Sequence, residues 1–292
     1  MSPVSPVAPL LDELHAARPV RAWSLIVTLF GDAIVPRGGS LWLGSLTEIM
    51  ALFRIDAGHV RTAMSRLTAD GWLTRARIGR NTYYRLSKQA EASFAAATRR
   101  IYFGLEPPFD GRLRIALLGP GVDDRSAVRP ALAAAGFAAL SPTAYVGVAD
   151  PPVELSATPG VFVLRAAADD SRKVAEAAWR HRALDVEYRR FLDRFEPTAH
   201  ALTAGATLDG ADAMVTRTLL IHHFRRVVLR DPGLPAVLLP PDWPGMQARA
   251  LAAQLYRRLV PASEAWLERR ARGEHGPLGP PDAMFKDRFS RP

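Results

Sequence analysis

Apolar residues near the start of the chain recur with the spacing of an amphipathic helix. Val20, Trp23, Val27 and Phe30 follow one another at intervals of three or four residues, which predicts a helix over residues 18–32. The sequence Pro-Arg-Gly-Gly at 36–39 ends this pattern. Residues 1–16 contain three prolines and little periodicity, so we expect them to form a flexible arm.

Two short helices are predicted between residues 45 and 70. The sequence Ser-Leu-Thr-Glu at 45–48 has the pattern of a capping box, with Ser45 as the N-cap of the first helix. Asp56 is placed to cap the second helix, which runs to about residue 70 and stops before Gly71. Val60, Met64 and Leu67 form its apolar face. Two helices separated by so few residues indicate a helix-turn-helix.

A hairpin follows these helices. Residues 72–77 and 82–86 read as strands around the short turn Gly79-Arg80-Asn81. Helix, short helix, helix and hairpin is the order of a winged helix-turn-helix, which we assign to residues 17–104. Ser87 is expected to cap a further helix, and the pair Pro107-Pro108 marks the first domain boundary.

The middle of the chain alternates between strand and helix patterns. Strands are predicted at 113–118, 138–146 and 161–166, and helices at 124–135 and 171–179. This β-α-β-β-α order suggests a ferredoxin-like domain over residues 111–184, without a visible closing fourth strand.

The remainder is helical in its periodicity. We assign residues 185–272 to a helical domain that is interrupted by the proline-rich segment 231–245. Residues 273–292 are charged and contain prolines, so we expect a flexible tail. The fold class is therefore α+β.

Charge is concentrated in the predicted winged helix. The chain has a net charge of +9, and residues 54–88 alone hold eight basic and two acidic side chains. Such a patch is typical of a protein that binds a polyanion such as double-stranded DNA, although a solvated surface is the alternative. The chain has no cysteine, no apolar run of 18 residues and no secretory signal pattern. We therefore expect a cytoplasmic protein that does not enter a membrane.

The exposed side of the helix over 57–70 suits the major groove of DNA. Its middle carries the small residues Gly58, Thr62 and Ser65, and Arg61 and Arg66 flank them. Small residues permit close approach to the groove, and arginines reach guanine edges or phosphates. An ordinary solvated helix face remains the alternative.

Basic side chains continue along the hairpin. Arg75, Arg77 and Arg80 lie on it together with Tyr83, and Arg80 sits at the turn. In a winged helix that turn places a side chain in the adjacent minor groove. We take these four residues as candidate DNA contacts.

Other candidate sites fail on chemistry. The loop 119–124 lies between a strand and a helix, but Asp124 stands where a dinucleotide-binding loop needs glycine, so Asp124 is better explained as an N-cap. Asp123 with Asp124 as a nuclease metal site is a weaker alternative. His222 and His223 are adjacent and cannot share one metal in the usual i, i+4 manner. No nucleophile elbow or phosphate-binding loop occurs. We predict no catalytic residue and no metal site.

Several blocks of the sequence resemble the PaaX family. They lie at 43–46, 60–67, 70–73 and 79–87, then at 109–112, and finally at 221–226, 229–232 and 240–245. The members of this family are bacterial repressors of phenylacetate catabolism. The resemblance implies a winged helix, a Cas2-like ferredoxin-fold domain and a helical C-terminal domain. It also implies a homodimer that binds operator DNA and that an acyl-CoA thioester, typically phenylacetyl-CoA, releases from it.

With this resemblance, the segment 222–230 becomes a candidate effector site. Arg225, Arg226 and Arg230, together with His222, would meet the phosphates of coenzyme A through charge-assisted hydrogen bonds. A basic surface or an interdomain salt-bridge helix explains the same residues equally well. We predict a repressor with no enzymatic activity and no cofactor besides this effector. An enzyme that processes or binds acyl-CoA and a Cas2-like nuclease are the alternatives.

Overall fold

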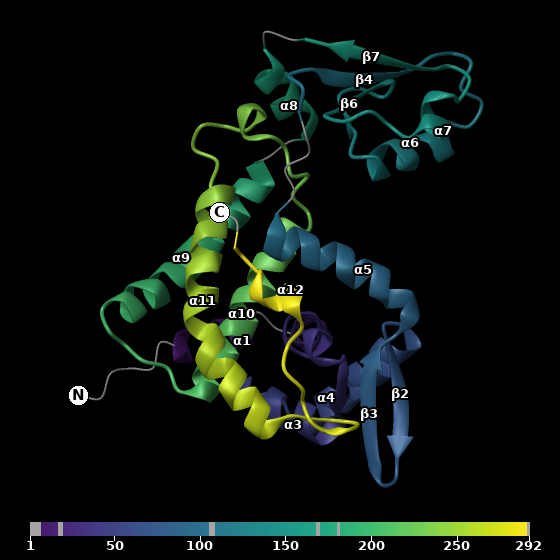
Figure 1. Cartoon of the computed structure of the whole chain (residues 1–292). Helices are drawn as coiled ribbons and strands as arrows, with labels where there is room; N and C mark the ends of the chain where they lie inside the picture. Colours follow the sequence, from purple (N-terminus) through teal and green to yellow (C-terminus); the bar gives the residue numbers. More distant parts are fainter. Residues whose placement is uncertain (1–6, 17–19, 105–108, 168–169, 180–181, 291–292) are drawn as a thin grey trace. The chain divides into compact units, whose positions relative to one another are not determined.

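The computed structural model describes residues 7–16, 20–104, 109–167, 170–179 and 182–290, which form two compact units of an α+β chain (Figure 1). Unit 1 contains Met1–Phe103, Tyr188–Leu229 and Met246–Pro292, and unit 2 contains Gly104–Glu187 and Arg230–Gly245. The proline pair Pro107-Pro108 lies outside the described residues. None of the described helices combines the length and the apolar character that a membrane span requires.

Unit 1 begins with helices that surround a small sheet. Its N-terminal elements are α1 (Ala8–Ala16), α2 (Ala22–Leu29), the π-helix η1 (Phe30–Ile34), the 3₁₀ helix η2 (Val35–Arg37), β1 (Ser40–Trp42), α3 (Leu43–Leu52), α4 (Ala57–Ala69), β2 (Leu73–Ile78), β3 (Asn81–Leu86), α5 (Lys88–Thr98) and the π-helix η3 (Arg99–Phe103). The strands form an antiparallel sheet in the order β1-β3-β2.

Local chemistry sets the ends of α4 and α5 as the sequence predicts. The Asp56 carboxylate accepts hydrogen bonds from the amides of Gly58 and His59, and Gly71 after α4 has a φ of +74°. Ser87 caps α5 by accepting from the Ala90 amide. Asp56 thus marks the start of α4 before the hairpin, and Ser87 marks the start of α5 after it.

The capping box predicted at Ser45 does not form. Helix α3 begins at Leu43, so Ser45 lies inside it and is buried. Its hydroxyl accepts from the Arg272 amide at 3.0 Å, which joins α3 to the C-terminal part of the chain. A tertiary partner has therefore replaced the expected local one.

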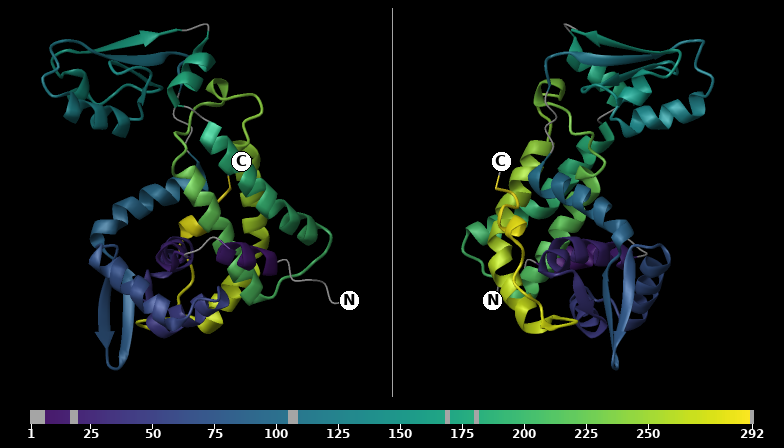
Figure 2. Two further views of the ribbon diagram at one scale, coloured as in Figure 1. Left: turned by 180° about the vertical axis from the view of Figure 1, so that it is seen from behind. Right: turned by 45° about the vertical axis from the view of Figure 1, so that its right-hand side comes forward.

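The C-terminal half of unit 1 is helical and includes α9 (Arg182–Thr203), α10 (Gly210–Val228), α11 (Gly245–Arg270), the short strands β8 (Arg272–Gly273) and β9 (Gly276–Pro277), and α12 (Ala283–Lys286). The residues of α9 from Tyr188 onward and those of α11 from Met246 onward belong to unit 1. Helix α10 packs on α2. The helices predicted as a separate domain over 185–272 thus share a unit with residues 20–103. The two views of Figure 2 show the β2–β3 hairpin projecting beyond these helices.

Both ends of the described chain differ from the flexible segments expected at 1–16 and 273–292. In α1, Leu10 and Leu11 are buried, as is the preceding Val7. Near the other end, Phe285 packs inside and Phe289 is only 1% exposed. The prolines and charges of the sequence gave no indication of these buried apolar side chains.

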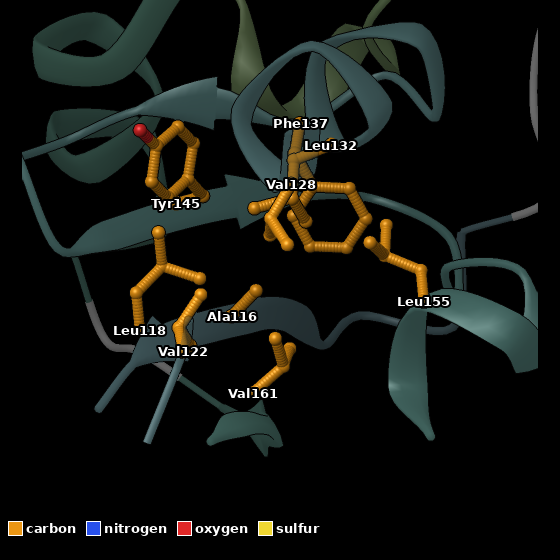
Figure 3. Close-up of a cluster of buried hydrophobic side chains, with 9 residues drawn as sticks. All are labelled: Ala116, Leu118, Val122, Val128, Leu132, Phe137, Tyr145, Leu155 and Val161. Carbon is orange, nitrogen blue, oxygen red and sulfur yellow. The ribbon is translucent and has the colours of Figure 1, made fainter. Parts of the chain in front are cut away.

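Unit 2 is built on a four-stranded antiparallel sheet. Its elements are β4 (Leu113–Leu118), α6 (Arg125–Ala134), β5 (Ala138–Ala139), β6 (Ala144–Gly147), α7 (Val153–Ser156), β7 (Val161–Ala166), α8 (Ser171–Trp179) and the 3₁₀ helix η4 (Ala236–Leu238). The strand order is β5-β6-β4-β7. Its core gathers nine buried side chains, among them Ala116, Leu132 and Phe137, between the sheet and α6 and α7 (Figure 3).

The single strand predicted over 138–146 is two strands. A turn separates β5 from β6, and the Ser141 hydroxyl accepts from the amides of Thr143 and Ala144. Because one predicted strand is divided into β5 and β6, the sheet has four strands instead of the three that the sequence pattern showed.

Candidate nucleic-acid interface

Helix α4 divides cleanly into a buried and an exposed side. Val60, Met64 and Leu67 are at most 1% exposed, as the helical spacing predicts. Arg61, Thr62, Ser65 and Arg66 are exposed, and Gly58 in the first turn is half-buried. The ridge of small side chains with an arginine on each flank therefore faces solvent.

The two arginines of α4 differ in their surroundings. The Arg66 guanidinium lies 5.1 Å from the centre of the Trp23 ring, and its Nε donates to Asp70 at 3.4 Å. Arg61 has no ion-pair or hydrogen-bond partner within the described residues. Arg61 can therefore meet an external anion without losing an internal contact. The Trp23 contact could not be predicted from local spacing, because Trp23 belongs to a different helix.

The hairpin carries its arginines on one strand and at its turn. Ile78 pairs with Asn81, so Gly79 and Arg80 form a two-residue turn. Gly79 has a φ of +60°, which the first position of a type II′ turn requires and a side chain disfavours. Arg80 is exposed at this tip, and Arg75 and Arg77 are exposed along β2.

The two tyrosines of the hairpin lie on opposite faces. Tyr84 is buried and pairs with Arg75, whereas Tyr83 is half-buried and lies opposite Ala76 and Trp42. Side chains of paired residues share a face, so Tyr83 is on the other face from Arg75 and Arg77. The structure does not bring Tyr83 together with these arginines.

Acidic partners neutralise only part of the basic segment 54–88. Arg54 pairs with Asp12, Arg66 with Asp70, and Arg85 with Glu274. Arg61, Arg75, Arg77 and Arg80, which we call the unpaired arginines, have no carboxylate partner among the residues that the structure describes. They are the groups of this segment that an external polyanion would neutralise.

The residues predicted to bind an effector separate into different environments. His222 is 5% exposed, and its Nδ1 lies 3.2 Å from the Thr28 hydroxyl. Arg225 donates to the Thr28 and Ser24 hydroxyls, and Arg226 is exposed. Arg230 belongs to unit 2, where it pairs with Glu187. The structure therefore does not gather the four residues within one unit.

A buried polar cluster is the feature that the sequence analysis missed. The Asp32 carboxylate, 2% exposed, accepts from Arg217 Nε at 2.7 Å and from Arg288 at 3.0 Å. The hydroxyls of Tyr102 and Tyr256 also donate to it, at 2.7 and 2.8 Å. An aspartate inside the apolar run 29–34 was the available signal, because such a carboxylate needs partners.

The charges of this cluster balance one another. Burial alone would raise the pKa of Asp32, but Arg217, Arg288 and the two tyrosine hydroxyls hold that pKa below its ordinary value. Arg217 also pairs with Glu264, which in turn accepts from Arg37. These contacts join η1, η2, α10, α11 and the C-terminal segment, which explains why residues 20–103, 188–229 and 246–290 form one unit.

The acidic loop 119–124 has a structural role at its end. Asp124 caps α6 by accepting from the amides of Ser126 and Ala127, as the sequence predicts. Among the described residues no group of three or more histidine or acidic side chains is arranged to hold a metal ion.

Comparison with known proteins connects these features to a family. Residues 21–90 match the family model described as PaaX-like protein, and residues 179–269 match the PaaX-like protein C-terminal domain. The chain is 34% identical to the transcriptional repressor PaaX of Escherichia coli (strain K12) over an alignment that covers 94% of this chain and 91% of that protein. It also resembles the solved structure of the uncharacterized protein Rv0674 from Mycobacterium tuberculosis, with 24% identity, a TM-score of 0.49, and coverage of 76% and 89% of the two chains.

Proposed function

This chain belongs to the PaaX family, and on that premise we propose that it represses phenylacetate catabolic genes by binding operator DNA through α4 and the β2–β3 hairpin. The relative in Escherichia coli is a transcriptional repressor, so this chain is a regulator of transcription and not an enzyme. No cofactor is part of the proposal.

The order of elements in unit 1 supports a winged helix-turn-helix over residues 17–104. Helices α3 and α4 are separated by four residues, and the β2–β3 hairpin follows α4 directly. The strand β1 completes the small sheet beside β3. In this arrangement α4 is the recognition helix and the hairpin is the wing.

The unpaired arginines are the single observation that carries the DNA-binding proposal. Arg61 lies on the exposed ridge of α4, and Arg75, Arg77 and Arg80 lie on the projecting hairpin. The small side chains of Gly58, Thr62 and Ser65 allow α4 to approach the edges of the bases closely. Arg66 lies on the same helix, and its guanidinium could leave the exposed ion pair with Asp70 to pair with a DNA phosphate. Tyr83 is proposed as a contact from the other face of the hairpin.

The topology of unit 2 supports a ferredoxin-like, Cas2-like domain. In order of appearance its strands are arranged as the second, third, first and fourth, all antiparallel, with α6 between the first two. A ferredoxin-like β-α-β-β-α-β unit has this order. Its short second helix is α7, between β6 and β7.

The same unit offers a surface for the proposed homodimer. Leu117 pairs with Phe162 and Ile115 with Leu164, so these side chains lie on one face of the sheet. Phe162 and Leu164 are 57% and 52% exposed. Contiguous exposed apolar residues on a sheet mark an association surface, and a second copy of this chain is the partner we propose.

We further propose that an acyl-CoA thioester such as phenylacetyl-CoA releases the operator. Arg226, exposed on α10, is the best placed of the predicted effector residues to pair with a coenzyme A phosphate. Arg225 and Arg230 remain candidates at their separate positions. His222 acts in this proposal by holding Thr28 rather than by touching the phosphates.

The DNA interface is tested by measuring operator affinity after selection of bound fragments from random DNA. Arg61→Ala should weaken binding by about 1–3 kcal/mol and relax the preference at one base position. Arg172→Ala, an exposed arginine of unit 2, is the matched control and should bind as the original protein does. Equal affinity of both variants would refute the assignment of α4.

The wing is tested by the salt dependence of the same binding. Because Arg80 sits at the hairpin tip, Arg80→Ala should reduce the slope of log affinity against log salt by roughly one. An unchanged slope would place the hairpin away from DNA.

A further inference from the structure

Unit 1 contains a cavity of about 420 Å³ whose lining includes Trp72, three residues after the end of α4. Its walls come from α2, η1, α5, η3 and α10 and from Trp72, the last of the three residues that link α4 to β2. Most of the lining is apolar, and it includes Val27, Trp72, Phe94, Ala97 and Ile221. The volume is within the range of about 300–1,000 Å³ that binds small molecules.

Arg225 at this cavity has no acidic partner among the residues that the structure describes. Arg225 lines the cavity, and its guanidinium donates to Thr28 Oγ1 at 2.7 Å and to the carbonyl and hydroxyl oxygens of Ser24 at 2.9 Å. All these acceptors are neutral. Burial, together with the nearby charge of Arg226, lowers the pKa of Arg225 to about 10.

The contrast with Arg217, two turns earlier on α10, shows that this imbalance is specific to the cavity. Arg217 is also buried, but it faces the carboxylates of Asp32 and Glu264. Asp32 is part of the cavity lining as well, yet its oxygens are occupied by Arg217, Arg288 and two tyrosines. The lining also includes Arg100, whose guanidinium donates to the Val228 carbonyl at 3.4 Å. Arg225, held by neutral oxygens on α2, is the buried arginine that an electron-rich ligand oxygen would complement.

We propose that this cavity binds the aryl-acyl end of the effector, with the ring among Trp72, Phe94 and Ala97 and the acyl oxygen accepting a hydrogen bond from Arg225. The inference rests on the proposed function in that it takes the ligand to be an acyl compound. The shared chemistry is an aromatic group that bears a carbonyl or carboxylate oxygen, supplied by either a thioester or the free acid.

The position of Trp72 explains how such a ligand would act on DNA binding. The Trp72 amide donates to the Leu67 carbonyl in the last turn of α4, and the Trp72 carbonyl accepts from Ser87 at the start of α5. Its ring meets Phe94 of α5 edge-on at 5.9 Å. A ligand that displaces the Trp72 ring therefore acts on the connection between the recognition helix and the wing. A ligand that favours one position of this connection shifts its equilibrium.

The site is tested by calorimetric titration of the full chain with phenylacetyl-CoA, phenylacetate and coenzyme A alone. Ala97→Phe fills the cavity from α5 and should weaken binding of the acyl ligand by about tenfold or more. Ala95→Phe is the matched control, because Ala95 is exposed on the same helix and does not line the cavity. It should bind as the original protein does. Binding by the thioester only, or also by the free acid, identifies the source of the acyl group.

A second variant guards against misfolding of Ala97→Phe. Trp72→Phe keeps an aromatic ring, and in it the change of tryptophan fluorescence on ligand addition should be lost while binding is retained. Full affinity in Ala97→Phe, an unchanged fluorescence response in Trp72→Phe, or binding of neither acyl ligand would overturn the cavity assignment.

Operator release measured in parallel separates this inference from the proposed function. Binding that Ala97→Phe weakens, without any release of DNA, supports the site and refutes the regulatory proposal. Release of DNA by the thioester with equal potency in Ala97→Phe and Ala95→Phe supports the regulation and refutes this site.

Discussion

At the centre of unit 1 the Asp32 carboxylate meets two guanidinium groups, whereas the sheet and helices of unit 2 enclose apolar side chains (Figure 3). The residues of the Asp32 cluster are far apart in sequence, at positions 32, 102, 217, 256 and 288. The core of unit 2 lies within residues 116–161. The Asp32 cluster therefore joins distant segments by directional charge contacts, whereas the apolar core of unit 2 is assembled from neighbouring segments, beside the ion pairs of Arg114 with Asp110 and Asp150.

This difference has an energetic consequence. A buried ion pair adds little net stability when complete, because desolvation of both partners offsets their attraction, but it is very sensitive to the loss of one partner. An apolar core loses stability according to the volume that is removed. Loss of one charged partner should therefore destabilise unit 1 most at the fully buried Asp32 cluster, because the aspartates that pair with Arg114 in unit 2 remain half exposed.

The largest effect should come from Asp32→Ala, which leaves Arg217 and Arg288 buried without their shared carboxylate. We expect the free energy of unfolding of unit 1 to fall by about 3–5 kcal/mol. Denaturant unfolding combined with peptide-resolved hydrogen exchange measures the loss in each unit. Asp170→Ala removes a carboxylate from an exposed pair with Lys173 and is the control. A loss no greater than that of the control would show that the cluster carries no such stability.

The converse test removes volume from the core of unit 2. Leu132 is fully buried against the sheet, so Leu132→Ala should cost about 2–5 kcal/mol, with faster exchange confined to unit 2. Leu140→Ala, at a side chain that is 44% exposed, should cost far less. Faster exchange in α10 of unit 1 as well would contradict the independence of the two cores.

A smaller effect should follow from pH through His222 and His223. Burial lowers the pKa of both, and nearby charges lower it further, from His223, Arg225 and Arg226 at His222 and from Arg194 and Arg226 at His223. The pKa of His223 falls to about 3. In the unfolded chain both imidazoles take up protons near pH 6.5. Below that pH the unfolded state thus binds more protons than the folded state. The stability of unit 1 should therefore decrease as the pH is lowered below about 6.5, by about 1.4 kcal/mol per pH unit for each histidine.

Unfolding measured at pH 7 and pH 5 checks this slope. The double variant His222→Gln with His223→Gln should show a shallower dependence, and unit 2, which has no histidine among its described residues, should show none from this source. The same slope in the double variant would assign the dependence to other groups.

The ends and the faces of α4 and α5 were predictable because their signals are local. Asp56 and Ser87 cap helices that begin at the next residue, and Val60, Met64 and Leu67 are spaced so that one side must be buried. The exposed arginines of the candidate DNA interface follow from the same periodicity. Ser45 is the counterexample, because its hydroxyl found a partner at Arg272 that no local pattern encodes.

The sequence by itself therefore determined the helix, helix and hairpin order of residues 43–86, the exposed side of α4, the concentration of positive charge around it and the family of the chain. Only the tertiary structure decided which arginines remain unpaired, that α10 and the C-terminal segment share a unit with α2, and that a cavity forms beside Trp72. The physical reason is range. Capping and periodicity act over a few residues, whereas Asp32 stabilises unit 1 through side chains that lie up to 256 positions further along the chain.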